Sequence, residues 1–198
     1  MTLATLPVPH VRSVTRSLAR WVSVTRSPFT GTIQTQDWGI TGATWWEYEI
    51  EIALLTGRNG QRMSAFLAEL GGAAGRFLFA DPSIVNTTGV GTPLVKGAGQ
   101  SGTSLITDGW SATGLLAGDF FSLGTDTGTR LYQITADVVP AAGNATIQFV
   151  PPLRSSPADN APLQVTAPQV VLRPTATIPA SIASANKYTF SFSAREAI

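Results

Sequence analysis

Apolar and polar side chains alternate strictly in residues 42–57, GATWWEYEIEIALLTG. Every second position is apolar: Trp46, Tyr48, Ile50, Ile52 and Leu54. Three acidic side chains lie between them: Glu47, Glu49 and Glu51. A period of two is typical of a strand that buries one face and exposes the other. The pattern predicts a long strand with three like charges, roughly 7 Å apart, on its polar face. Those charges need water, a counter-charge or a partner.

The period changes directly after this strand. The next apolar residues follow the i, i+3, i+4, i+7 spacing of one helical face: Met63, Phe66, Leu67 and Leu70. Gly71 is suited to end this helix, and Thr56 or Asn59 is suited to cap its start. Residues 77–80 then predict a short strand, closed by the Asp-Pro pair at 81–82.

Four basic residues and no acidic ones occur in residues 11–26: Arg12, Arg16, Arg20 and Arg26. The spacing of the first three suits a helix, but the β-branched and serine content favours an extended arm or strands. Residues 29–39 alternate weakly and predict a short strand that ends at a turn.

Beyond Pro82 the chain is rich in Gly, Ser and Thr, with short apolar islands. Residues 118–139 predict two strands around the turn TDTG, and further strands follow near 145–150 and 163–175. Strands spaced by roughly 8–12 residues are typical of a small barrel or sandwich. The glycine-rich residues 89–102 are interpreted as a flexible loop. A last strand places three aromatic side chains on one side: Tyr188, Phe190 and Phe192.

These elements predict a mainly β, β-rich α+β fold with one helix. The last strand has the strict alternation seen in the N-terminal part and not the Gly-, Ser- and Thr-rich composition between them, which suggests that the middle part is an inserted unit. We therefore expect one domain formed by residues 1–82 and 170–198, and a second β-domain formed by residues 83–169.

The amino-acid composition excludes several classes of protein function. Charged residues make up 13% of the 198 residues, about half of the usual share of roughly 25%, which suggests surface covered by other protein. The net charge of +1 argues against general nucleic-acid binding. The absence of cysteine excludes disulfides and thiolate metal sites. Without a signal peptide or an apolar run of roughly 20 residues, we expect a soluble chain with no membrane anchor.

Catalytic and metal-binding signals are weak. His10 is the only histidine, so a usual zinc site cannot form, and a loop histidine is the simpler interpretation. No phosphate-binding loop of the P-loop type is present. A strand holds the three glutamates too far apart to share one calcium ion. We therefore expect no catalytic residue, metal or cofactor, and no enzyme. Trp45 and Trp110 remain candidates for contact with a partner protein or a glycan.

The basic residues of 11–26 and the three glutamates are complementary in charge. Pairing within one molecule would only neutralise them, whereas pairing between copies would set the orientation of a ring.

Five short segments follow one another along the chain: QTQDW (34–38), FLFADP (77–82), GAGQSGTSLITDGW (97–110), PPLR (151–154) and FSFSAREA (190–197). In this order they resemble the distal tail proteins of tailed bacteriophages and prophages, from the baseplate hub of long, flexible, non-contractile tails. The resemblance covers about residues 36–197.

The resemblance implies a belt-like N-terminal β-domain with one helix, which forms a ring of typically six copies. It also implies an outward β-barrel, OB-like or galectin-like. The implied location is the distal end of the virion tail, after assembly in the host cytoplasm. The implied partners are other copies of the chain, the tail tube protein, the tape measure protein and hub or fibre proteins, with DNA passing through the lumen.

On this hypothesis the glutamates either pair with the arginines of a neighbouring copy or line the channel, where they would repel DNA. Pairing is favoured here because the four arginines otherwise lack partners. The alternatives are another tail component, such as a tail terminator or tube-end adaptor, and a carbohydrate-binding receptor-recognition module.

Overall fold

The structure is a computed structural model that describes residues 3–7, 11–39, 43–183 and 186–198. Strands account for 47% of the chain and helical turns for 11%, so the predicted mainly β fold is confirmed. The described residues contain a single α-helix, three strand assemblies and two short 3-10 turns. None of the described helices is both long and apolar enough to cross a membrane.

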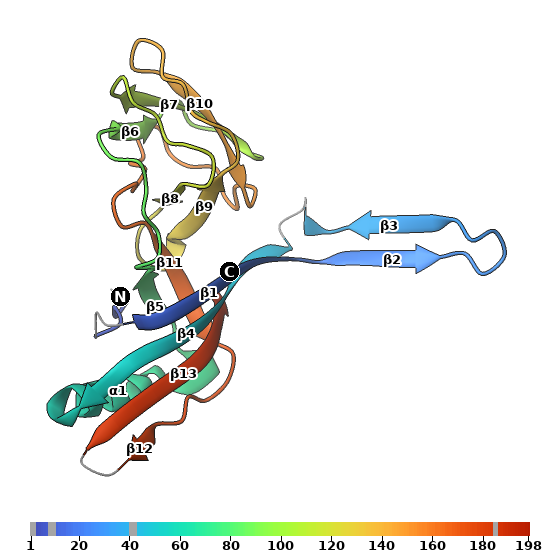
Figure 1. Ribbon diagram of the computed structural model, residues 1–198. Coiled ribbons are helices and arrows are strands. Elements are labelled where there is room, and N and C mark those ends of the chain that lie inside the picture. Colours follow the sequence, from blue (N-terminus) through green and yellow to red (C-terminus); the bar gives the residue numbers. More distant parts are fainter. Residues whose placement is uncertain (1–2, 8–10, 40–42, 184–185) are drawn as a thin grey trace.

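The first sheet is antiparallel and combines strands from both ends of the chain (Figure 1). Its order is β1 (Val11–Arg20), β4 (Thr44–Thr56), β13 (Lys187–Glu196), β11 (Gln169–Pro174) and β5 (Phe77–Ala80), and β12 (Ser181–Ala183) pairs with β13.

The long strand β4 lies between β1 and β13 and buries its apolar side chains as predicted, with one exception. Leu54 is 55% exposed, whereas Leu55 is buried. The pairing with β13 shows why, because Ile52 lies opposite Phe190 and Leu55 lies opposite Tyr188. Two residues of β4 therefore stand against one of β13, and this β-bulge shifts the alternation by one position. The expectation that Leu54 continues the apolar face is wrong for this reason.

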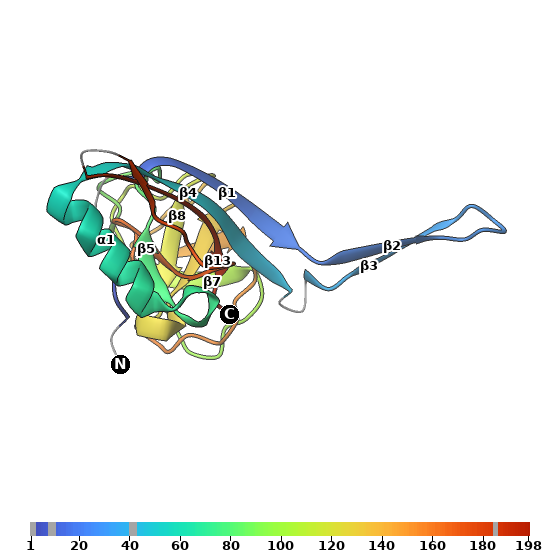
Figure 2. The same ribbon diagram turned by 90° about the horizontal axis from the view of Figure 1, so that it is seen from below.

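Helix α1 (Gly57–Leu70) covers one end of the apolar face of this sheet (Figure 2). Met63 and Leu67 are buried in the core, and the Phe66 ring meets Phe77 edge-on at 6.1 Å. The helix ends at Gly71, which has the left-handed φ of 66° predicted for a glycine stop, before the 3-10 turn η2 (Gly72–Ala74). Thr56 occupies the N-cap position, but its side chain makes no capping hydrogen bond.

The second sheet is a curled half-barrel. Its order is β6 (Gly91–Val95), β7 (Ser104–Trp110), β10 (Ala145–Val150), β9 (Arg130–Ile134) and β8 (Phe120–Leu123). Strands β8 and β9 form the predicted hairpin, through the 3-10 turn η3 (Asp126–Gly128). Its core is built around three aromatic rings with centroids 5.2–5.3 Å apart: Phe121, Tyr132 and Phe149.

The interpretation of residues 89–102 as a flexible loop is wrong in part, since β6 occupies 91–95 with Val95 fully buried. Residues 160–164 run along both edges of the curled sheet, with bridges from Leu94 to Pro162 and from Ser122 to Gln164. The choice between an OB-like and a galectin-like barrel stays a prediction.

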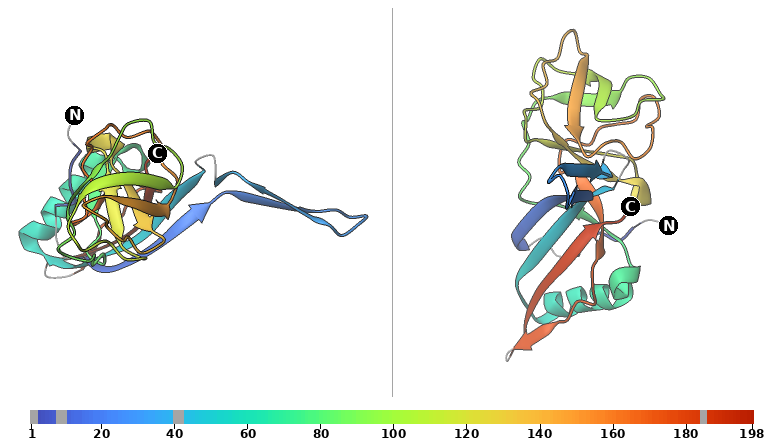
Figure 3. Two further views of the ribbon diagram at one scale, coloured as in Figure 1. Left: turned by 90° about the horizontal axis from the view of Figure 1, so that it is seen from above. Right: turned by 90° about the vertical axis from the view of Figure 1, so that its right-hand side faces the viewer.

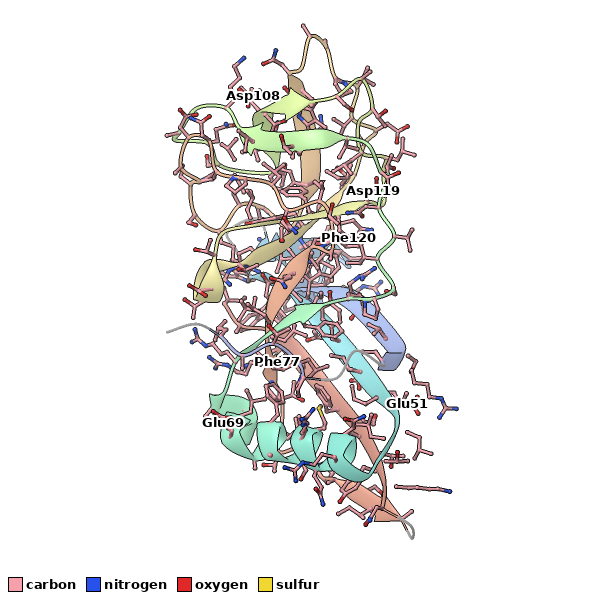
Figure 4. The ribbon with its side chains drawn as sticks, turned by 90° about the vertical axis from the view of Figure 1, so that its left-hand side faces the viewer. Glu51, Glu69, Phe77, Asp108, Asp119 and Phe120 are labelled. Atoms are coloured by element: carbon pink, nitrogen blue, oxygen red, sulfur yellow. The ribbon has the colours of Figure 1, made fainter. Side chains whose placement is uncertain are left out.

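The two sheets meet at the aromatic residues Trp46 and Phe120, whose ring centroids are 5.8 Å apart. Figure 4 labels Phe120 at this junction. The Trp46 indole Nε1–H donates a hydrogen bond of 2.9 Å to the carbonyl of Leu131. The Asn86 side chain donates to the carbonyls of Phe120 and Val165. The first sheet thus draws on residues 11–80 and 169–196, and the second on 91–150. The division into two separately folding domains stays a prediction.

Strands β2 (Val22–Arg26) and β3 (Ile33–Asp37) pair only with each other. They form a hairpin that leaves the body where β1 ends and β4 begins (Figures 1 and 2). The left view of Figure 3 shows that it extends away from the two sheets. The sequence predicted strands here, but not their projection from the body.

Candidate assembly surfaces

The projecting hairpin, residues 21–38, is called here the arm. Its cross-strand pairs put different chemistry on its two faces. One face carries Val22, Val24, Arg26, Ile33, Thr35 and Asp37, and the other carries Ser23, Thr25, Gln34 and Gln36. The first face therefore carries three apolar side chains together with an arginine, an aspartate and a threonine, and the second carries only hydroxyl and amide groups.

The apolar residues of the arm are open to solvent. Val24 is 63% exposed and Ile33 67% exposed, and Phe29 at the tip is 95% exposed. An isolated two-stranded hairpin is at best marginally stable in water. An exposed apolar patch of this kind marks a contact surface for another protein.

Local hydrogen bonds set the arm's shape at both ends. At its base the Trp21 N–H donates to the carbonyl of Ala43, and the Trp38 N–H donates to the carbonyl of Trp21, both at 3.0 Å. An ion pair between Arg20, the last residue of β1, and Asp37 of β3 ties the base of the arm to the first sheet. That hydrogen-bonded ion pair lowers the pKa of the Asp37 carboxyl and raises the pKa of Arg20. At the tip the Gly31 N–H donates to the Ser27 carbonyl, with Gly31 at a φ of 69°.

A second surface is the open face of the first sheet. The three glutamates of β4, here called the acidic row, are flanked by five short polar residues and one arginine. Their partners on β1 are Ser13, Thr15 and Ser17, and their partners on β13 are Ser191, Ser193 and Arg195. Glu47 and Glu49 are exposed and Glu51 is half-buried. This face of the sheet is therefore polar, as is typical of a solvent-exposed surface.

The four arginines of residues 11–26 do not act together. Arg12 donates to Glu51 of the acidic row at 3.0 Å, and Ser13 donates to the same carboxylate. Arg16 pairs with Asp81, on the opposite side of the sheet, and Arg20 pairs with Asp37. Arg26, on the arm, forms no ion pair with any residue that the structure describes. The expectation that all four lack partners in their own chain is wrong for three of them.

The two candidate tryptophans differ in exposure. Trp45 is half-buried beside the acidic row, and its Nε1–H donates to Glu47 at 3.0 Å. Trp110 is only 6% exposed, and its Nε1–H donates to Thr107 at 2.8 Å inside the second sheet. The prediction that Trp110 contacts a partner or glycan is wrong, because its ring completes a core.

A buried ion pair that the sequence did not reveal joins the two units. Arg154, just after β10, donates to Glu196 of β13 at 3.3 Å and also to the carbonyl of Thr44. The same Glu196 oxygen accepts the backbone N–H of Trp46 at 3.3 Å. Burial raises the pKa of Glu196, and the positive charge of Arg154 opposes that shift. No sequence pattern links these partners, because they are 42 residues apart.

The described residues contain no group of three or more His, Asp and Glu side chains that could hold a metal ion. His10 lies outside the described residues, so its predicted place in a loop is not assessed. The same holds for the glycine before the long strand, Gly42.

Comparison of the sequence with known protein families found no family model that matches, and a comparison with curated proteins also found no match. Any proposal for function must therefore rest on the surfaces described above and on the resemblance of the sequence segments.

Proposed function

We propose that this protein is a structural component of a bacteriophage tail, a distal tail protein that assembles into a closed ring. The arm is the observation that carries the proposal. A hairpin that exposes Val22, Val24 and Ile33 on one face gains its stability from a second protein surface. This argues for an assembly protein rather than for an enzyme or a free binding module.

Another copy of the chain is the simplest partner for the arm. The arm leaves the body at one end of β1 and β4, so it reaches a neighbour rather than its own sheets (Figure 3). A contact between an arm and a different surface of the next copy is heterologous, and such contacts generate rings when the rotation closes. The family resemblance supplies the number, typically six copies.

The acidic row belongs, in this proposal, to the channel. Three observations favour the channel over pairing with a neighbour's arginines. Arg12, Arg16 and Arg20 already have carboxylate partners in their own chain. The row is flanked by serine, threonine and Arg195 rather than by apolar residues that could pack against the arm. A negative wall would also repel the DNA that passes through a tail, so that it does not adhere.

In the same proposal the ring joins the tail tube above to the hub and fibres below, and the second sheet faces outward. No specific nucleic-acid binding, cofactor or membrane anchor is part of it. A glycan-binding module is the less favoured function, because one of its two candidate tryptophans is buried.

The experiment is the solution mass of the purified protein, measured by light scattering over a range of protein and salt concentrations. We expect a discrete closed oligomer near six copies that becomes more populated with concentration. Apolar contacts through the arm should also make the oligomer tolerant of salt. A monomer at every concentration and salt level would contradict a ring that the chain forms by itself.

A further inference from the structure

Two arginines stand directly opposite each other at one corner of the first sheet. Arg173 of β11 is the register partner of Arg195 of β13. Like charges in directly opposed positions of an antiparallel pair destabilise a sheet. A negative group between or above them would remove that cost.

Among the described residues, neither arginine forms an ion pair. The ion pairs of the described residues involve other arginines, namely Arg12, Arg16, Arg20 and Arg154. The Nε–H of Arg173 is buried without a hydrogen-bond acceptor. A buried donor that is left unsatisfied is costly, so this position favours an incoming acceptor.

The nearest acidic side chains are already engaged elsewhere. Glu47 is the register partner of Arg195, but its carboxylate accepts the Trp45 indole N–H and forms no ion pair with that arginine. Glu196 follows Arg195 in the strand, so its side chain points to the opposite face, where it binds Arg154. Neither carboxylate therefore forms an ion pair with Arg173 or Arg195.

A cavity of about 230 Å³ opens between these groups, lined by Trp45, Arg173, Arg195, Glu196, Ala197 and Ile198. One wall is the half-buried indole of Trp45, and the arginines form another. The cavity thus combines an aromatic surface with charged donors in a confined space.

We propose that this cavity receives the carboxylate of an acidic side chain, glutamate or aspartate, from a partner protein. The planar guanidinium fork matches a carboxylate with two parallel hydrogen bonds. The indole of Trp45 offers an apolar wall for the methylene groups of the incoming side chain. The proposal rests on the proposed function only in that the partner is then a neighbouring tail protein; the site itself is independent of ring formation.

The test uses the full chain, labelled with ¹⁵N, and two probes of equal shape. The α-N-methylamide of N-acetyl-L-glutamate is titrated against the α-N-methylamide of N-acetyl-L-glutamine, so that the two probes differ only in the side-chain carboxylate, while NMR follows the Nε–H signals of Trp45 and Arg173. We expect saturable shifts with the glutamate probe and none with the glutamine probe. Arg195→Gln should weaken the binding by about tenfold, the loss of one charged contact worth roughly 1.4 kcal/mol.

Arg62→Gln is the matched control, because Arg62 is an exposed arginine on α1, away from this corner. It should leave the shifts unchanged. The proposal is overturned if both probes act alike, if Arg62→Gln weakens binding as much as Arg195→Gln does, or if inorganic phosphate binds as well as the carboxylate. The NMR titration does not require an oligomer. If the protein forms the ring but does not bind the glutamate probe, only the carboxylate site is contradicted. If the protein stays monomeric but binds the probe, only the ring proposal is contradicted.

Discussion

The guanidinium of Arg16 lies 4.2 Å from the centroid of the Phe120 ring, where it joins the edge strand β1 to strand β8 of the second sheet. The same guanidinium pairs with Asp81, whose side chain is 1% exposed. One of the four arginines of residues 11–26 therefore serves as a structural link at the junction of the two sheets.

Replacing Arg16 by alanine should destabilise the protein strongly. The change leaves the buried carboxylate of Asp81 without its counter-charge, which typically costs about 3–5 kcal/mol in the free energy of unfolding. Urea unfolding measures this. Arg12→Ala is the matched control, since the Arg12–Glu51 pair is exposed and such pairs contribute about 1 kcal/mol or less. Equal losses for the two variants would contradict the structural importance of Arg16.

The apolar face of the arm should be needed for assembly. Val24→Asp removes an apolar side chain worth roughly 1.5–3 kcal/mol when buried, so the association constant should fall about tenfold or more. Light scattering over a dilution series measures this fall in the association constant. Thr25→Asp adds the same charge to the other face of the same strand and should weaken assembly less. If Thr25→Asp is the more harmful variant, then the polar face of the arm makes the contact.

The acidic row should be dispensable for ring formation if it lines the channel. Glu49→Arg should leave the oligomer mass unchanged and should increase retention of duplex DNA at low salt, because a repulsive wall becomes partly attractive. Glu69→Arg, at an exposed position of α1, supplies the same charge change elsewhere. Dissociation of the oligomer by Glu49→Arg alone would instead favour pairing with a neighbour.

Glu196 should make stability depend on pH. Its folded-state pKa lies above its ordinary value of 4.5, because burial favours the protonated form. Its contribution is therefore fully present below the unfolded pKa and is lost as the pH rises through the raised folded pKa. Glu196→Gln should gain stability relative to the original protein as the pH rises above about 4.5. Urea unfolding of both proteins from acid to neutral pH measures the difference, and a difference that stays constant would refute this cause.

Gly60 should resist replacement although it lies within a helix. A Cβ at this position would overlap the ring of Tyr188, so α1 could not keep its close approach to β13. Alanine is normally about 1 kcal/mol better than glycine in a helix interior, yet we expect Gly60→Ala to destabilise by about 1–3 kcal/mol. Gln61→Ala, at the exposed next position, is the control for propensity alone. A stabilised Gly60→Ala protein would show that the helix can move away from the sheet without loss.

Local patterns were sufficient for much of this fold. The alternation in residues 44–52, the helical spacing from Met63 to Leu70 and the glycine stop at 71 each depend on neighbours within a few residues. The backbone geometry of strands and helices turns such spacing directly into a buried face. The strand at 77–80 and the hairpin around residues 125–128 were predictable for the same reason.

Tertiary contacts decided the rest. The bulge that exposes Leu54 depends on how β13 pairs with β4, more than 130 residues later in the chain. The partners of Arg16 and Arg154 lie 65 and 42 residues away in sequence, and the burial of Trp110 depends on the curled sheet that forms around it. The sequence specifies the charge and size of each side chain. Its partner and its exposure depend on which distant segments the fold brings beside it. The sequence by itself therefore determined the elements of this protein, and the packing of those elements decided which charges are neutralised, which tryptophan is buried and which hairpin projects from the body.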